Sequence, residues 1–445
     1  MTGEALRATG ELGSWAAALR WEEVPDPVRA RLPLVLFDVL GACAAGARLP
    51  EQRALVEAWD PAPGPAPLVG GGRSVSVEDA AWLNGIATVC LELDEGNKYA
   101  RGHPAAHGFS AVLALAARLD ADGPTTAAAL LVAYEVAARF GRATTLNAGA
   151  HPHGSWGVTG AAAGCARLLG LDGDAVAAAI DTGAGLPVAA HFASALDGNP
   201  VRDAWMGAAN SSGLAAARMA AAGLARNTGT AGHTLGGLLG SFEPGELVAE
   251  LGTRWDITLG YFKRHASCSF THPAADAVLE LRPALAGRAV EEILVETHSL
   301  GAGLDRVTWD NRLSAMFSTP FVVATAFLRG RVGPEASIPP ALHDPEVVEL
   351  ASRVRVAVAP DLDARLPGER PARVTVRTRD GARHVHEVPN PVGDVDHHPL
   401  TEADLSGLLS GLLGDGTLPG RLRDCAGRLP EAPGVRDLLG SLADP

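Results

Sequence analysis

Lysine is almost absent from this chain. Of its 37 basic residues only Lys98 and Lys263 are lysines, and the other 35 are arginines. A bias of this size indicates that arginine has replaced lysine at ordinary surface positions. Arginine does not replace a titratable amine or a compact positive charge. The two lysines are therefore candidates for a specific role, with survival by chance as the alternative.

Other absences exclude whole classes of function. The chain has no basic run, only 5% aromatic residues and a net charge of −14, so nucleic acid is not an expected partner. Its five cysteines are scattered and form no CxxC pair, which favours reduced thiols over disulfides or a zinc site. No dinucleotide fingerprint, P-loop, HExxH or GxSxG motif occurs. His103 and His107 have the spacing of helical zinc ligands, but Pro104 places His103 before the helix, so no metal is expected.

The sequence also lacks the pattern of a membrane segment. The N-terminus has neither the basic start nor the apolar centre of a signal peptide. The most apolar early run, Leu32 to Ala47, contains Asp38 and is too short to span a bilayer. We therefore expect a soluble, cytoplasmic protein without membrane contact.

The length of 445 residues and the high alanine and glycine content indicate two or three domains rich in helix. Up to residue 265 apolar residues recur at helical spacing. Thr125 or Thr126 after Pro124 is the expected N-cap of the fifth helix, and Gly141 its expected end. The predicted helices are Trp15–Arg20, Pro27–Ala45, Val77–Cys90, Ser110–Leu119, Thr125–Phe140, Ser155–Leu169 and Arg202–Ala225.

After about residue 285 the pattern changes to that of an α+β module. Val290–Thr297 and Val354–Val358 are predicted strands, and Ala372–Val388 a hairpin that turns at Arg379-Asp380-Gly381. Thr319–Leu328 is a predicted helix. The chain then returns to helix at Thr401–Gly411, which begins with a capping pattern, and at Pro433–Leu442.

Four polar segments interrupt the apolar helices. Segment 91–108 has the most ionisable residues. Such groups are costly among apolar neighbours unless they are paired, and loops that gather them often carry function. Its ionisable residues are Glu92, Asp94, Glu95, Lys98, Tyr99, Arg101, His103 and His107.

The other three segments carry histidine, arginine and lysine. Segment 149–157 has His151 and His153 before a helix, whose N-terminus lowers the pKa of a nearby histidine; solvated turn histidines are the alternative. Segment 197–207 has Arg202, which grips a carboxylate or pairs with a neighbouring aspartate. Segment 260–273 contains Lys263 and Arg264, together with Cys268, which is more plausible as a buried bystander than as a nucleophile.

The order of these motifs resembles the MmgE/PrpD family, which includes 2-methylcitrate dehydratase, cis-aconitate decarboxylase and an iminodisuccinate epimerase. The resemblance spans nearly the whole chain. It rests on LELDEGNKYARGHP, GAHPHGSWG, GNPVRDAWMG, YFKRHASCSFTHP and TPFVVATAF in this order.

The resemblance implies a mainly α fold. It has a large all-α domain formed by both chain ends (1–265 and 397–445) and a smaller inserted α+β lid domain (266–396). It also implies a homodimer and a cofactor-free site between the domains for small di- or tricarboxylates. His103, His151 and Lys263 match the two histidines and the lysine of the family's motifs.

The chain also departs from the family pattern. Glu92 stands where the family commonly has an aspartate, Gly96 or Asn97 where it often has a threonine, and Arg202 where it has a lysine. Phe321 replaces a tyrosine of the decarboxylase branch. These changes leave carboxylate binding possible and put hydroxyl-dependent chemistry in question.

Residues and resemblance together predict proton transfer next to a carboxylate, which needs a base near neutral pKa and cations for the developing charge. His103 and His151 are the expected base and acid, in either order, with Lys263 binding a carboxylate and Asp94 or Glu92 orienting a histidine. The leading function is a dehydrating or decarboxylating lyase; the alternatives are an isomerase or epimerase, and a non-catalytic carboxylate-binding homologue. The expected substrate-binding residues are Arg202, Lys98, Arg101, Arg264 and His153.

Overall fold

The computed structural model describes residues 2–414 and 416–444. It is mostly helical, with 57% helix and 10% strand, which confirms the predicted mainly α class. Two separate cores can be distinguished. One joins apolar residues of 5–266 with residues of 400–442, and we call this part the helical body. The other lies within 274–388, here called the α+β part.

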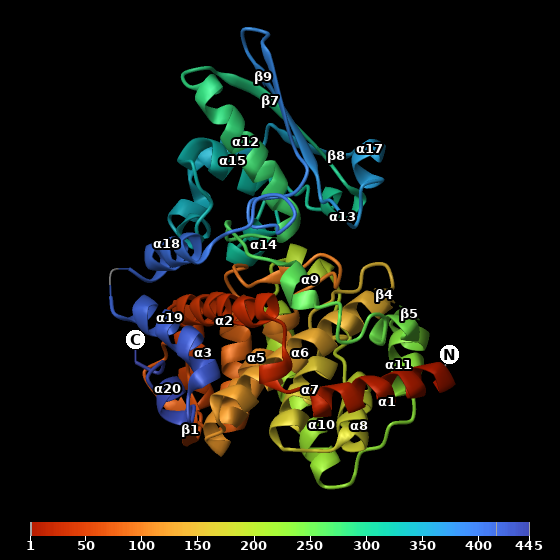
Figure 1. The fold of residues 1–445 in the computed structure, drawn as a ribbon. Helices are drawn as coiled ribbons and strands as arrows, with labels where there is room; N and C mark the ends of the chain where they lie inside the picture. Colours follow the sequence, from red (N-terminus) through yellow and green to blue (C-terminus); the bar gives the residue numbers. More distant parts are fainter. Residues whose placement is uncertain (1, 415, 445) are drawn as a thin grey trace.

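Helices of the helical body pack around α5, α6 and α7, which are buried along most of their length (Figure 1). The C-terminal helices α19 and α20 contact α2 and α5 respectively, far from them in sequence. The helices up to residue 233 are α1 (Thr2–Ala18), α2 (Asp26–Ala47), α3 (Pro50–Trp59), α4 (Val77–Val89), α5 (Pro104–Leu119), α6 (Gly123–Ala143), α7 (Val158–Leu168), α8 (Gly173–Ala184), α9 (Ala193–Leu196), α10 (Val201–Ala221) and α11 (Thr230–His233). The C-terminal helices are α18 (Glu402–Leu413), α19 (Leu418–Arg428) and α20 (Arg436–Gly440).

The α+β part contains a four-stranded sheet in the order β10-β9-β7-β8, in which only β7 and β8 run parallel. Helices α12 and α15 pack on it (Figure 1). The strands are β7 (Val290–Thr297), β8 (Val354–Val358), β9 (Ala372–Thr378) and β10 (Arg383–Val388); the helices are α12 (His272–Leu281), α13 (Ser299–Ala302), α14 (Arg312–Met316), α15 (Thr319–Arg329), α16 (Pro345–Ala351) and α17 (Pro360–Asp363). All four predicted strands are confirmed.

Three two-stranded ladders were not predicted. They are β1 (Pro63–Pro67) with β2 (Ser74–Val75), β3 (Gly96–Asn97) with β6 (Gly260–Tyr261), and β4 (Thr144–Leu146) with β5 (Gly240–Phe242). The second ladder matters most, because it places the polar loop 91–103 against the segment that leads to Lys263.

Several predicted helix boundaries are wrong. The N-cap of α6 is Asp122, which accepts a hydrogen bond from Thr125 N at 2.7 Å, because Pro124 belongs to the first helical turn. The helix continues past Gly141, whose glycine serves close packing instead: a Cβ there would lie 2.5 Å from Ala100 O. Helix α7 begins only at Val158. The capping box at Thr401 is confirmed.

Among the described residues α2 is long and apolar enough to cross a membrane, but 72% of its apolar window is buried inside the protein. Burial of this extent is typical of the core helix of a soluble protein. A cytoplasmic location stays a prediction.

Candidate active site

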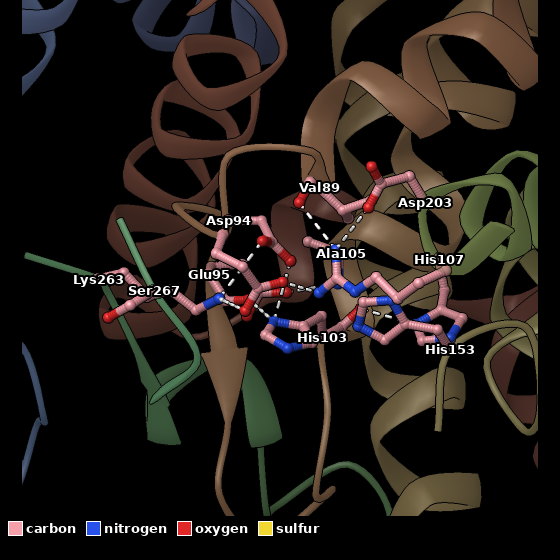
Figure 2. Close-up of polar contacts among 12 residues, drawn as sticks. Val89, Asp94, Glu95, His103, Ala105, His107, His153, Asp203, Lys263 and Ser267 are labelled. Atoms are coloured by element: carbon pink, nitrogen blue, oxygen red, sulfur yellow. Dashed lines mark hydrogen bonds and ion pairs between the residues drawn. The ribbon is translucent and has the colours of Figure 1, made fainter. Parts of the chain in front are cut away.

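The loop between α4 and α5 carries the densest group of buried charges. It leaves α4 through Glu92, whose φ of +53° is left-handed, and reaches α5 at His103, the N-cap before Pro104. Glu92, Asp94 and Glu95 are at most 1% exposed. The pairing of β3 with β6 holds the middle of the loop, so Glu92 and Asp94 lie against Lys263. Figure 2 shows Asp94 beside Lys263.

Glu92 lies between two cations. Its Oε2 is 3.2 Å from Lys263 Nζ, and its Oε1 pairs with Arg202 Nη2. Lys263 also approaches Asp94 Oδ1 at 3.5 Å. Arg202, in the first turn of α10, donates further to Val89 O and to Asp203 at 2.9 and 3.0 Å. Burial lowers the pKa of Arg202, and the partners on three sides keep its charge compensated.

Asp94 and His103 form a carboxylate–imidazole pair. His103 Nδ1 lies 3.0 Å from Asp94 Oδ2 and 2.6 Å from the carbonyl oxygen of Glu95. Both oxygens are acceptors, so Nδ1 carries the proton and Nε2 of the neutral ring presents its lone pair. Burial raises the pKa of Asp94, but the positive charges of His103, when it is protonated, and of Lys263 outweigh this effect and lower the pKa to about 2.

Glu95 has a different environment although it is the next residue. Its Oε1 accepts from Ala105 N at 2.7 Å and its Oε2 from the Tyr134 hydroxyl at 3.4 Å. Burial raises its pKa to about 7. Two adjacent carboxyls are thus held apart in protonation, a pattern that accompanies acid–base sites.

Three further histidines surround His103. The ring of His153 lies 5.1 Å from that of His103 and 4.5 Å from that of His151, measured between centroids. The ring of His107 lies 6.0 Å from that of His153, and Figure 2 shows these two residues next to each other. All four are at most 9% exposed. The alternative of solvated turn histidines at His151 and His153 is therefore wrong.

Hydrogen bonds fix the protonation of two of these rings. His151 Nδ1 accepts from His153 N at 3.1 Å, so the neutral ring carries its proton on Nε2. His107 Nδ1 donates to His103 O and its Nε2 accepts from Gly154 N. Burial lowers the pKa of His151 to about 3 and that of His107 to about 4. The cause is burial beside other histidines and not the helix N-terminus that the sequence suggested.

Two buried polar atoms of this group have neither a hydrogen-bond nor an ion-pair partner within 2–414 and 416–444. They are Arg202 Nε and His153 Nδ1. Buried polar groups are usually satisfied, so an unsatisfied pair in one cluster indicates a place for a polar ligand or water.

A cavity of about 190 Å³ lies beside Lys263, between the helical body and the α+β part. It combines charged groups with apolar walls from α18. Its lining includes Asp38, Leu93, Lys263, Arg264, Arg331, Leu405 and Leu408. Burial raises the pKa of Asp38 well above its usual range, so this wall carries less negative charge than the sequence indicates.

Of the ten candidate residues, seven lie together: Glu92, Asp94, His103, His151, His153, Arg202 and Lys263. The other three have partners outside this group, although Arg264 lines the cavity beside Lys263. Lys98 pairs with Asp394 and Asp396, and Arg101 donates to Thr144 O and the Thr145 hydroxyl. Arg264 is 42% exposed in its side chain and lies 3.6 Å from Asp276. Whether these three contact a ligand stays a prediction.

Sequence reasoning did not assign Glu95, His107, Tyr134 or Asp38 to the site. Glu95 and His107 lie in the polar segment 91–108, and the other charged residues of that segment could have marked them as site residues. Tyr134 and Asp38 lie on apolar helices and nothing local marks them. Cys268 is buried and its thiol pKa is raised by burial, as a bystander's would be. Phe321 packs 4.8 Å from Trp309, between ring centroids, within the core of the α+β part.

Among the described residues no group of three or more histidine, cysteine, aspartate or glutamate side chains has a geometry that holds a metal ion. What the cluster offers is a histidine with a free Nε2 oriented by a carboxylate, a second histidine with an Nε2 proton, and two buried cations.

Comparison with family models gives two matches along the chain. The MmgE/PrpD N-terminal domain model matches residues 10–237, and the MmgE/PrpD C-terminal domain model matches residues 265–407. No curated protein matches the chain. Since the two models cover most of the sequence, the chain belongs to the MmgE/PrpD family.

Proposed function

We propose that the protein is a cofactor-independent lyase that acts on a small di- or tricarboxylate by proton transfer at a carbon next to a carboxylate, with loss of water or of carbon dioxide. Family membership supports a dehydratase- or lyase-like or related activity. The observation that carries the proposal is His103, whose Nδ1–H is held by Asp94 and Glu95 O while Nε2 is free to accept a proton.

In this mechanism His103 Nε2 takes the proton from carbon. The imidazolium that forms is stabilised by Asp94, whose low pKa keeps it ionised. Lys263 and Arg202 stabilise the negative charge that develops on the substrate carboxylate, in a buried site where such charges interact strongly. The unpartnered Arg202 Nε is a donor available for that carboxylate.

His151 is the proposed hydrogen-bond donor to the reacting group. Its neutral ring carries a proton on Nε2, and burial keeps the ring neutral around pH 7. In a dehydration this N–H hydrogen-bonds to the leaving hydroxyl, and the proton that completes the water is the one that His103 took from carbon, so both rings end neutral. In a decarboxylation carbon dioxide leaves first, and a proton that His103 has taken up from solvent replaces it on the product carbon. The hydrogen bonds of the two rings therefore support His103 as the base, a role that the sequence left open between the two histidines.

An epimerase is the second candidate, because two histidines, one neutral and one protonated, also suit removal and return of a proton on opposite faces. Phe321 also favours the epimerase, because its ring is buried in a core and has no hydroxyl that could donate a proton to a leaving group. A binding protein that retains the fold is the third candidate. The small carboxylate substrate, homodimer, cytoplasmic location and two-domain organisation with a lid at 266–396 are parts of the same proposal.

The test incubates the protein with citrate-like and aspartate-like acids in D₂O and follows them by proton NMR. An unsaturated or decarboxylated product supports the lyase; deuterium incorporation next to a carboxylate without such a product refutes it in favour of the epimerase. His103→Gln should abolish both outcomes. If no acid reacts but one raises the melting temperature, the binding protein is the correct reading.

A further inference from the structure

Lys98 is the one lysine that the proposed chemistry leaves unused. Its Nζ lies 3.1 and 3.2 Å from the two oxygens of Asp394 and 2.7 Å from Asp396 Oδ2. The side chain is 1% exposed. Both aspartates belong to residues 389–399, which lead from β10 back to α18 and which we call the return segment.

The backbone of Lys98 is held by the α+β part as well. Arg370 Nη2 donates to Lys98 O at 3.1 Å. The Arg370 guanidinium lies over the rings of Tyr261 and Phe270, 5.7 and 5.3 Å from their centroids, and the residue is 7% exposed. Lys98 is therefore fixed at both its ammonium and its carbonyl by residues more than 270 positions away.

The return segment also contacts the residue before the second lysine. Phe262 N donates to Gly393 O at 3.2 Å. Gly393 has a φ of +106°, and a Cβ there would lie 2.0 Å from Phe262 O, so only glycine permits this approach. On the other side, Val392 N donates to Asp276 of α12 at 2.8 Å.

We propose that Lys98 is a positioning residue that clamps the return segment and thereby holds Lys263 between Glu92 and Asp94. The path runs from Lys98 to Asp394, through Gly393 to Phe262, and along the chain to Lys263. A compact ammonium meets three carboxylate oxygens at once, whereas the planar fork of arginine is suited to coplanar acceptors. This explains why the position is lysine in a chain that otherwise uses arginine.

The placement of Lys263 can be measured without knowing the substrate, because the chain has only two lysines. Protein labelled with ¹³Cε,¹⁵Nζ-lysine gives two side-chain signals, which Lys98→Met and Lys263→Met assign. We expect the Lys263 signal to shift in Lys98→Met and in Asp394→Asn, although neither substitution touches a direct partner of Lys263.

The matched control is Arg306→Gln, which removes an exposed ion pair with Asp197 (2.7 Å) without touching the return segment; its Lys263 signal should coincide with that of the wild type. If Lys98→Met does not fold, Asp394→Asn alone decides. An unshifted Lys263 signal in a folded Asp394→Asn protein overturns the proposal.

The effect on turnover rests on the proposed function. Lys98→Met should lower kcat/KM about 10- to 100-fold through misplacement of the Lys263 ammonium. In a Lys263→Met background, Lys98→Met should not lower kcat/KM any further, because the residue through which Lys98 acts is already absent. If kcat/KM falls there by the same factor as in the wild-type background, Lys98 does not act through Lys263. A wild type without turnover refutes the proposed function and leaves the NMR result to decide the clamp.

Discussion

Two buried groups, His107 and Glu95, should make opposite contributions to the stability of the protein between pH 7 and 5. His107 is 0% exposed, and both of its ring nitrogens are hydrogen-bonded in the neutral form. Burial lowers its pKa from 6.5 to about 4. In the unfolded chain His107 therefore binds a proton below pH 6.5, whereas in the folded protein it binds one only below about pH 4. The stability that this group contributes is present above pH 6.5 and is lost as the pH falls through that window.

Glu95 acts with the opposite sign. Its pKa is raised by burial from 4.5 to about 7, so between these values the folded protein holds a proton that the unfolded chain has released. The stability it contributes is complete below pH 4.5 and is lost as the pH rises through 7. At about 1.4 kcal/mol per pKa unit, lowering the pH from 7 to 5 costs about 2 kcal/mol through His107 and returns about 2 kcal/mol through Glu95.

Urea unfolding at pH 7, 6 and 5, followed by circular dichroism, measures both contributions. The quantity compared is the free energy of unfolding at pH 5 minus that at pH 7. Relative to the wild type, this difference should be about 2 kcal/mol higher in His107→Gln and about 2 kcal/mol lower in Glu95→Gln. The exposed His397→Gln is the control and should leave the dependence unchanged. A wild-type pH dependence in His107→Gln, or a smaller loss in Glu95→Gln, would refute the reasoning.

Three further predictions concern single residues. Asp94→Asn should lower kcat about 10- to 100-fold with little change in KM, because Glu95 O still fixes the His103 tautomer while the charge is lost; steady-state kinetics on the substrate found in D₂O check this, and an unchanged kcat contradicts it. Gly393→Ala should lower the free energy of unfolding by about 1–3 kcal/mol more than Gly72→Ala, which also has positive φ but nothing within 4 Å; equal losses in urea contradict it. Cys268→Ala should keep full turnover and iodoacetamide should label the thiol slowly, since burial raises its pKa; rapid inactivation contradicts it.

Periodicity predicted the elements that local sequence determines. Val290–Thr297 and Val354–Val358 are strands over the predicted ranges, because β-branched residues alternate there in a half-buried sheet. The helix ends were less accessible. Gly141 was interpreted as a helix end, but it is the contact point of α6 with Ala100, and such a tertiary contact leaves no local pattern.

The site was predictable in composition but not in pairing. Both lysines were singled out by the same argument, and only the structure separates Lys263, which meets Glu92, from Lys98, which meets Asp394. The ladder between β3 and β6 is two residues long and joins segments about 160 positions apart. The low pKa of His151 has a tertiary cause, burial beside other rings, where the sequence suggested a helix dipole.

Glu92 gives a direct test of ligand binding, because its carboxylate pairs with both cations that a substrate carboxylate would use. Oε1 pairs with Arg202 and Oε2 with Lys263 at 3.2 Å. In Glu92→Asp the side chain is shorter by one methylene, about 1.5 Å, too short to keep both contacts, and aspartate tolerates the left-handed backbone at this position. One cation is then released. Although the variant should be less stable without ligand, citrate should raise its melting temperature more than it raises that of the wild type. An equal or smaller rise would show that the two cations do not bind the ligand.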